Sequence, residues 1–210
     1  MMREEMNRMA PAYGGARFLS VVLHPLLMPV YALFFLFGGN TMFALIPAGT
    51  KLYCYLVTFW ALFLMPLCSL PVFKHFRLIR GYGLNDKQER VYPILVAVVC
   101  AFVGFWLLKR VMYTQIVQQL YLIVIILLSV FSVITLRWKM SMHMTAVGGA
   151  CAFVMMMGLK YPGDMRGAFM LMLLLAGMLG AARLYLKKHT PAQVYAGFLF
   201  GFGLVTAILF

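Results

Sequence analysis

The fold is decided by stretches such as QIVQQLYLIVIILLSVFSVITL, residues 115–136, a run of 22 residues with no charged side chain. An α-helix rises about 1.5 Å per residue, so about 20 apolar residues cross the hydrocarbon layer of a bilayer. The rest of the chain is also rich in hydrophobic residues and poor in charged ones. Of its 210 residues, 64% are hydrophobic and 11% are charged, and the mean hydropathy is +0.93. Soluble domains have about 25% charged residues, so the composition indicates an integral membrane protein.

The same length criterion finds seven candidate spans, at residues 18–38, 52–73, 93–113, 115–136, 144–161, 166–186 and 191–210. We expect an all-α helical bundle of about six to seven transmembrane helices, formed by residues 18–210 as one domain after a short N-terminal tail, residues 1–17. Six spans are the alternative, because the third and fourth candidate spans are separated only by Lys109, Arg110 and the polar pair Thr114-Gln115. Small residues predict close helix packing in the last three spans: Gly148, Gly149, Gly177, Gly180, Gly197, Gly201 and Gly203.

Seven alternating spans would put all four histidines on or near one membrane face, the face that also carries the N-terminus. These are His24, His75, His143 and His189. Five of the 18 Lys and Arg residues fall on the other face, which leaves 13 on the histidine face. Basic residues concentrate on the cytoplasmic side. We therefore expect a multi-pass protein of the inner (cytoplasmic) membrane whose histidine face is cytoplasmic.

The loop before the last span carries the polar sequence Arg183-Leu-Tyr-Leu-Lys-Lys-His189-Thr-Pro-Ala-Gln193. A guanidinium binds phosphoryl oxygens through two parallel hydrogen bonds, and an imidazole is a nucleophile or an acid near neutral pH. Pro191 favours a helix break, with Thr190 capping the last span. Gln193 is close enough to accept a hydrogen bond from His189 and so fix its tautomer. A second polar site, Ser141-Met142-His143, begins the fifth span on the same face.

These two stretches resemble signatures of the type-2 phosphatidic acid phosphatase superfamily, which are integral membrane lipid phosphatases. The third signature of that family is Ser-Arg, five residues, His, three residues, Asp; this chain has Ala182-Arg183, five residues, His189, three residues, Gln193. The second, Pro-Ser-Gly-His, corresponds to Met140-Ser141-Met142-His143. The resemblance covers residues 137–205. The last stretch also looks like that of dolichyl diphosphatases, in which glutamine can replace the aspartate.

The resemblance implies a nucleophilic role for His189, a leaving-group acid role for His143, and phosphate binding by Ser141 and Arg183, with no cofactor or metal. It implies hydrolysis of a lipid phosphate, polyprenyl diphosphate or phosphatidate-like, through a phosphohistidine. The first signature, Lys, six residues, Arg-Pro, is absent, and Lys87 and Arg90 are the nearest substitutes for its phosphate ligands.

Gln193 lacks the negative charge of the family's aspartate. The alternative function is therefore a catalytically degenerate protein that binds lipid phosphates. Other classes fit less well. The basic residues form no stripe for nucleic acid, and the five carboxylates and four scattered histidines show no metal-ligand spacing. Without a mid-span charge or an inverted repeat, a transporter has little support. The expected partners are a lipid phosphate and the bilayer.

Overall fold

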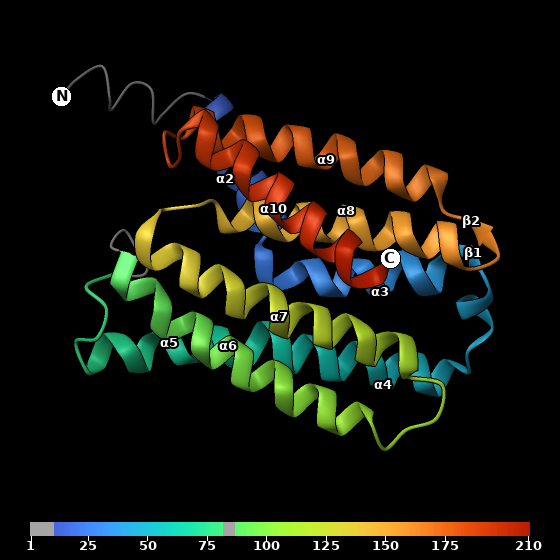
Figure 1. The fold of residues 1–210 in the computed structure, drawn as a ribbon. Helices are drawn as coiled ribbons and strands as arrows, with labels where there is room; N and C mark the ends of the chain where they lie inside the picture. Colours follow the sequence, from blue (N-terminus) through green and yellow to red (C-terminus); the bar gives the residue numbers. More distant parts are fainter. Residues whose placement is uncertain (1–10, 82–86) are drawn as a thin grey trace.

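Each apolar run of the sequence forms a helix, and together the helices make an all-α bundle in a computed structural model that describes residues 11–81 and 87–210 (Figure 1). Side chains of Asn40, Lys87, Gln88 and Arg90 lie outside this description. Seven segments of the described chain are long and apolar enough to cross a membrane: Pro11–Gly38, Ala48–His75, Val91–Leu108, Gln115–Arg137, Met142–Lys160, Arg166–Tyr185 and Pro191–Leu209. The prediction of an all-α membrane bundle is confirmed, with seven spans.

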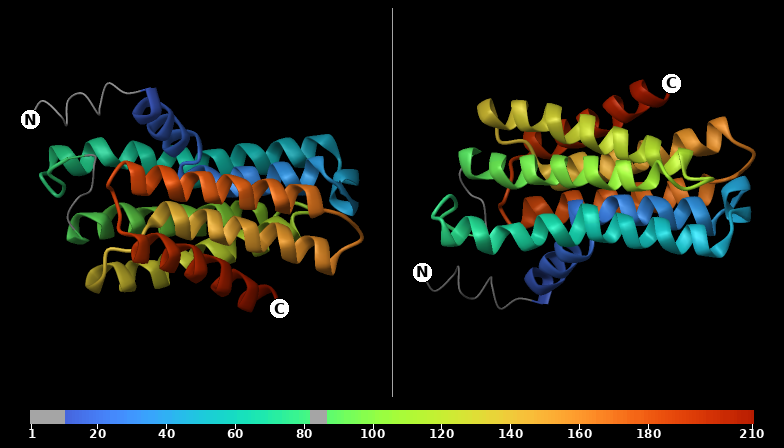
Figure 2. Two further views of the ribbon diagram at one scale, coloured as in Figure 1. Left: turned by 90° about the horizontal axis from the view of Figure 1, so that it is seen from above. Right: turned by 90° about the horizontal axis from the view of Figure 1, so that it is seen from below.

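The first two spans are interrupted helices. The first comprises α2 (Pro11–Val22), the short 3-10 helix η1 (Pro25–Leu27) and α3 (Met28–Gly38), and α2 turns away from α3 at the break (Figure 2). The second comprises α4 (Ala48–Thr58), a π-helical turn η3 (Phe59–Leu64) and α5 (Met65–His75). Proline explains both irregularities: its ring collides with the carbonyl four residues earlier, and Pro25 and Pro66 lie at these points.

The other five spans are continuous helices, namely α6 (Lys87–Leu108), α7 (Gln115–Arg137), α8 (Met142–Lys160), α9 (Arg166–Tyr185) and α10 (Pro191–Leu209). Several boundaries differ from expectation, among them those of α6, which begins at Lys87 rather than residue 93 and ends at Leu108 rather than residue 113. The first helix begins at Pro11, inside the segment expected to be the tail, and the second begins at Ala48 rather than residue 52. Pro11 is compatible with the start of a helix, because proline is favourable in the first helical turn. Hydropathy identifies the apolar part of a span and does not predict how far its helix continues beyond the hydrocarbon layer.

Helix α8 is the centre of the bundle. It packs against α3, α9 and α10, and 67% of its span is buried, whereas no other span exceeds 39%. Its contact with α10 is a close backbone approach. A Cβ at Gly201 would collide with the carbonyl of Thr145, and one at Gly148 with the carbonyl of Phe198. The packing role predicted for these glycines is confirmed. For Gly177 and Gly203 the prediction is wrong, because nothing lies within 4 Å of a Cβ at either.

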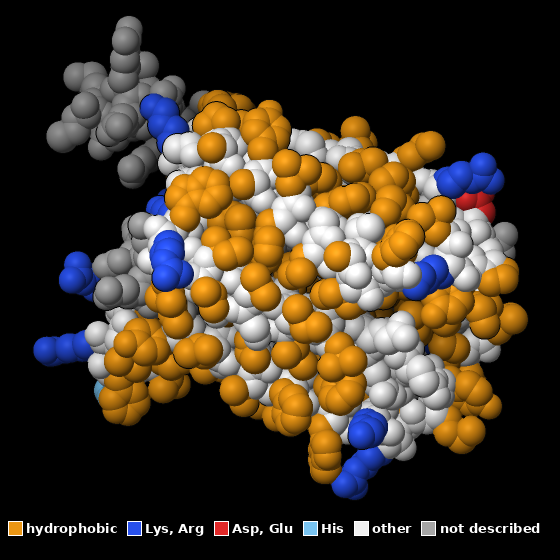
Figure 3. All heavy atoms as spheres, viewed as in Figure 1, with side chains coloured by type: hydrophobic (Ala, Val, Ile, Leu, Met, Phe, Trp, Pro, Cys, Tyr) orange, Lys and Arg blue, Asp and Glu red, His pale blue; other side chains and the backbone are white. Residues whose placement is uncertain are grey.

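Alternation of the spans gathers the loops at two ends (Figure 1). At one end, β1 (Asn40–Thr41), which precedes the 3-10 helix η2 (Met42–Leu45), pairs antiparallel with β2 (Gly163–Asp164). The α5–α6, α7–α8 and α9–α10 connections lie at the opposite end. Hydrophobic side chains cover the middle of the visible surface, and Lys and Arg lie towards its ends (Figure 3). This distribution suits a protein embedded in a bilayer.

Candidate active site

A cavity of about 220 Å³ is lined by residues at the start of α8, at the end of α9 and in the α9–α10 connection, together with residues of the broken first span and of α5 to α7. Four of the side chains that line it can carry positive charge: His24, His143, Arg183 and His189. The remaining lining is apolar and comes from η1, α5, α6, α7 and α8: Pro25, Leu26, Pro66, Leu67, Leu70, Pro93, Ile94, Ala97, Phe131 and Met142. No carboxylate is among these described lining residues. The cavity therefore favours an anionic ligand with an apolar part.

A tight turn brings Arg183 and His189 into the same cavity. Six residues separate them, so a continuous helix would point them in different directions. Helix α9 ends instead with Lys187 in the left-handed region, at φ 51°. The N–H of Lys187 donates to the carbonyl of Leu184, and that of Lys188 to the carbonyl of Arg183. This is the Schellman pattern of helix termination. It reverses the chain and places His189 beside the last turn of α9.

The first turn of α10 holds the imidazole of His189. Thr190 is the N-cap, Pro191 follows at the first helical position, and Thr190 and Gln193 form a capping box. The amide oxygen of Gln193 accepts from the N–H of Thr190 at 3.2 Å and lies 3.1 Å from Nδ1 of His189. An amide oxygen only accepts, so Nδ1 is the donor and the neutral ring carries its lone pair on Nε2. The hydrogen bond expected from the spacing is present.

His143 is fixed from a different part of the chain. Its Nε2 lies 3.1 Å from the backbone carbonyl of Ser20 on α2. The carbonyl can only accept, so Nε2 carries a proton and Nδ1 is the second proton site. The charge of Arg183 is close enough to act on His143 electrostatically, and His189 acts on it as well. His143, Arg183 and His189 thus belong to one site, on α8, α9 and the α9–α10 connection.

His24, one of the four histidines predicted to lie on or near one face, joins this site. Its ring lies edge-to-face with that of His143, at 5.7 Å between centroids, and it lines the same cavity. The sequence signal was the pair His24-Pro25 inside an apolar run, which breaks the first span. The break turns a residue of the hydrocarbon layer towards the end of the bundle. His75, by contrast, is exposed at the end of α5 and does not line the cavity.

The other candidate phosphate ligands lie elsewhere or outside the description. Ser141 is fully buried and is not a lining residue; its hydroxyl has no hydrogen-bond partner among the described residues. Its backbone N–H donates to the carbonyl of Gln193 at 3.3 Å, which joins the start of α8 to the first turn of α10. Lys87 and Arg90 belong to the first turn of α6, but their side chains lie outside the described residues.

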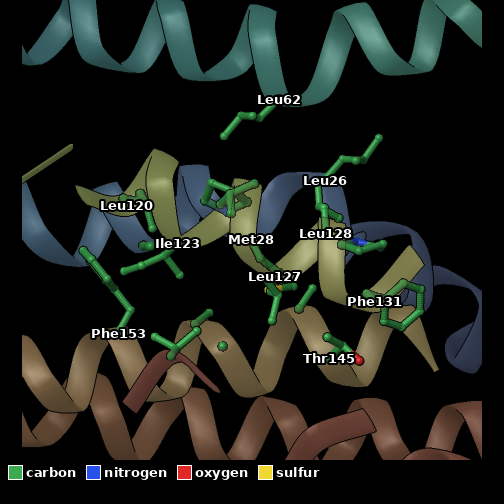
Figure 4. A pocket seen from close by; sticks show the side chains of 18 of the residues that line it. Leu26, Met28, Leu62, Leu120, Ile123, Leu127, Leu128, Phe131, Thr145 and Phe153 are labelled. Carbon is green, nitrogen blue, oxygen red and sulfur yellow. The ribbon is translucent and has the colours of Figure 1, made fainter. Parts of the chain in front are cut away.

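A second, smaller cavity of about 70 Å³ lies next to the first, inside the bundle (Figure 4). It is apolar: Leu120, Ile123, Leu127 and Phe153 point into it from α7 and α8. The two cavities share five lining residues, namely Pro25, Leu26, Ala97, Phe131 and Met142. A cavity lined by Arg183 and three histidines therefore adjoins an apolar one. In the described part of the chain, no group of three or more His, Cys, Asp or Glu side chains could hold a metal ion.

Residues 140–209 match the family model described as the PAP2 superfamily. This segment, one third of the chain, contains both polar stretches that line or support the cavity. No curated protein and no solved structure matches the chain significantly.

Proposed function

We propose that the chain is a membrane lipid phosphatase of the PAP2 superfamily, whose family model matches residues 140–209, and that its cavity hydrolyses a lipid phosphate ester or diphosphate through a phosphohistidine at His189. The observation that carries the proposal is the convergence of three family positions, His143, Arg183 and His189, on one cavity without a carboxylate among its described lining residues. This arrangement supplies a nucleophile, an acid and a cation to one ligand.

In the proposed reaction, Nε2 of His189 attacks phosphorus with the lone pair that the Gln193 contact leaves there. A nitrogen–phosphorus bond forms as the bond from phosphorus to the leaving oxygen breaks. Arg183 binds the equatorial oxygens, on which negative charge accumulates. His143 protonates the leaving oxygen from Nδ1, because its Nε2–H is held by Ser20. Water then attacks phosphorus and gives a proton to Nδ1 of His143 as the nitrogen–phosphorus bond breaks, which releases phosphate and restores both histidines.

The apolar second cavity supports a lipid as the substrate. A lipid phosphate has a charged head and a hydrocarbon chain, and the two adjoining cavities offer these surfaces in the same order. The proposed substrates are polyprenyl diphosphates or phosphatidate-like lipids. The excess of Lys and Arg at the cavity end supports a cytoplasmic opening in the inner membrane.

Phosphate release by the purified protein tests this function. Polyprenyl diphosphate, phosphatidate and phosphatidylglycerophosphate are each offered in detergent micelles, and wild type is compared with His189→Ala. The matched control is His75→Ala, which removes a histidine from outside the cavity. We expect release by wild type and by the control, and none by His189→Ala. Equal rates for wild type and His189→Ala exclude the proposed nucleophile.

A second function is favoured by one observation, the uncharged Gln193 where the family has aspartate. An amide orients His189 but does not stabilise its positive charge. The protein then binds lipid phosphates without turning them over. In that case no substrate releases phosphate, Gln193→Asp creates no activity, and lipid binding still depends on Arg183.

A further inference from the structure

The imidazole of His24 is held by a helix-capping hydrogen bond, and this hydrogen bond also determines which ring nitrogen carries the proton. It is the N-cap of η1, and its Nδ1 accepts a hydrogen bond from the N–H of Leu26 at 3.3 Å. Pro25 removes one backbone donor at this helix start, so His24 satisfies the next one. The imidazole therefore performs the capping function that Asn, Asp or Ser usually performs.

Capping leaves Nε2 as the proton-bearing nitrogen of His24. A ring nitrogen that accepts from a backbone N–H cannot itself carry a proton, so the neutral ring is protonated at Nε2. No hydrogen bond of the described chain uses Nε2. The ring lines the cavity, and the charge of Arg183 acts on it electrostatically. His24 thus brings a fixed donor to a cavity whose other charged or ionisable groups come from three later parts of the chain.

We propose that His24 is a fourth ligand-binding residue of this site, whose Nε2–H donates to a phosphate oxygen of the bound lipid phosphate. The inference rests on the proposed function and extends the site to the broken first span, outside the matched residues 140–209. A phosphoryl group has acceptor lone pairs on every oxygen, more than Arg183 alone can satisfy. The edge-to-face contact with His143, at 5.7 Å between centroids, places both imidazoles side by side in the same cavity.

Two substitutions separate this role from simple helix capping. In His24→Asn, the side-chain oxygen replaces Nδ1 and retains the cap, but nothing replaces Nε2–H. In His24→Gln, the longer amide returns an N–H near the position of Nε2 and gives up the cap. The proposal predicts that His24→Asn keeps its thermal stability and loses phosphate affinity about 10- to 100-fold, the range for hydrogen bonds to charged groups. His24→Gln is expected to retain more affinity than His24→Asn.

The measurements are the KM for lipid phosphate hydrolysis and, independently of turnover, the affinity for inorganic phosphate from the shift in melting temperature of the detergent-solubilised protein. His75→Asn is the matched control and is expected to behave as wild type. Wild-type affinity in His24→Asn overturns the inference, as does an affinity loss confined to His24→Gln. If wild type binds phosphate through His24 but releases none from any lipid, the proposed hydrolysis fails and the inference stands.

Discussion

The amide oxygen of Gln193 lies 3.1 Å from Nδ1 of His189 and also accepts the backbone N–H of Thr190. One atom therefore closes the capping box of α10 and orients the candidate nucleophile. The second bond identifies this atom as the oxygen rather than the nitrogen of the amide, since a backbone N–H must be given an acceptor. The orientation of His189 is thus tied to the formation of the helix that follows it.

Replacing Gln193 by Ala removes both hydrogen bonds, and His189 loses its fixed tautomer. A misplaced reacting group costs about 100-fold in rate, so we expect kcat for phosphate release to fall by about that factor. KM is expected to change little, because Arg183 is retained. Steady-state kinetics with a lipid phosphate substrate measure both. A rise in KM with no change in kcat contradicts an orienting role.

Replacing Gln193 by Glu keeps the oxygen that caps α10, because Glu also closes a capping box. The carboxylate adds a charge that stabilises a cationic imidazole. We expect phosphate release at least equal to that of wild type. Gln193→Ala and Gln193→Glu purified side by side distinguish loss of orientation from gain of charge. Equal losses in both variants would show that the amide nitrogen is needed.

Lys187 adopts φ 51° between α9 and α10, a conformation that glycine adopts without strain. We expect Lys187→Gly to raise the free energy of unfolding by about 0.5–1 kcal/mol, part of the left-handed penalty being offset by the greater freedom of an unfolded glycine. Thermal unfolding measures the change. Lys188→Gly is the control: it also removes a lysine, at a position outside the left-handed region. A matching rise in Lys188→Gly attributes the effect to charge instead.

The span count was predictable because runs of about 20 apolar residues have few other uses in a protein. Local irregularity was predictable only in part. Pro25 and Pro29, close to His24, are consistent with the broken first span, but nothing in the sequence marks the π-helical turn Phe59–Leu64. Pro66 could equally have produced a simple kink. Whether a proline produces a kink or a π-helical turn depends on the neighbouring helices. Here the hydroxyl of Tyr121 on α7 donates to Thr58, just before the π-helical turn.

The sequence predicts those parts of the candidate site that depend only on which membrane face a residue lies on. Counting spans put His143, Arg183 and His189 on one face, and the structure brings them into one cavity. Residue type could not predict the contact between His143 and Ser20, because the acceptor is a backbone carbonyl 123 positions away. The burial of Ser141 was equally hidden, since it results from the close approach of α8 and α10.

Gly201 and Gly203 lie on the same helix, yet they predict opposite responses to alanine. A Cβ at position 201 collides with the carbonyl of Thr145, whereas one at 203 has open space. Overpacking of this kind costs about 1–3 kcal/mol. We expect Gly201→Ala to lower the melting temperature and, because α8 and α10 carry His143 and His189, to reduce phosphate release. Gly203→Ala is expected to do neither. Equal melting temperatures would show that the backbone contact does not stabilise the bundle.

Ala146 lines the apolar cavity. Replacing it by a larger side chain tests whether the hydrocarbon chain of the substrate enters this cavity. In Ala146→Leu, the added carbons occupy part of a cavity of about 70 Å³. A long-chain lipid phosphate then loses apolar contact at about 0.8 kcal/mol per displaced methylene. Displacing two methylenes corresponds to roughly a tenfold loss in kcat/KM. A short water-soluble phosphate ester, which does not reach the cavity, is expected to react as with wild type.

Ala207→Leu is the matched control for this substitution, because it makes the same change on an exposed surface of α10. The comparison of long and short substrates within one variant cancels any general loss of folded protein. Equal losses on both substrates mean that Ala146→Leu distorts the catalytic cavity itself. No loss on either means that the chain lies elsewhere, for instance along the outer surface of the bundle. Only a selective loss on the long-chain substrate is consistent with a lipid whose head reaches His189 while its chain occupies the interior between α7 and α8.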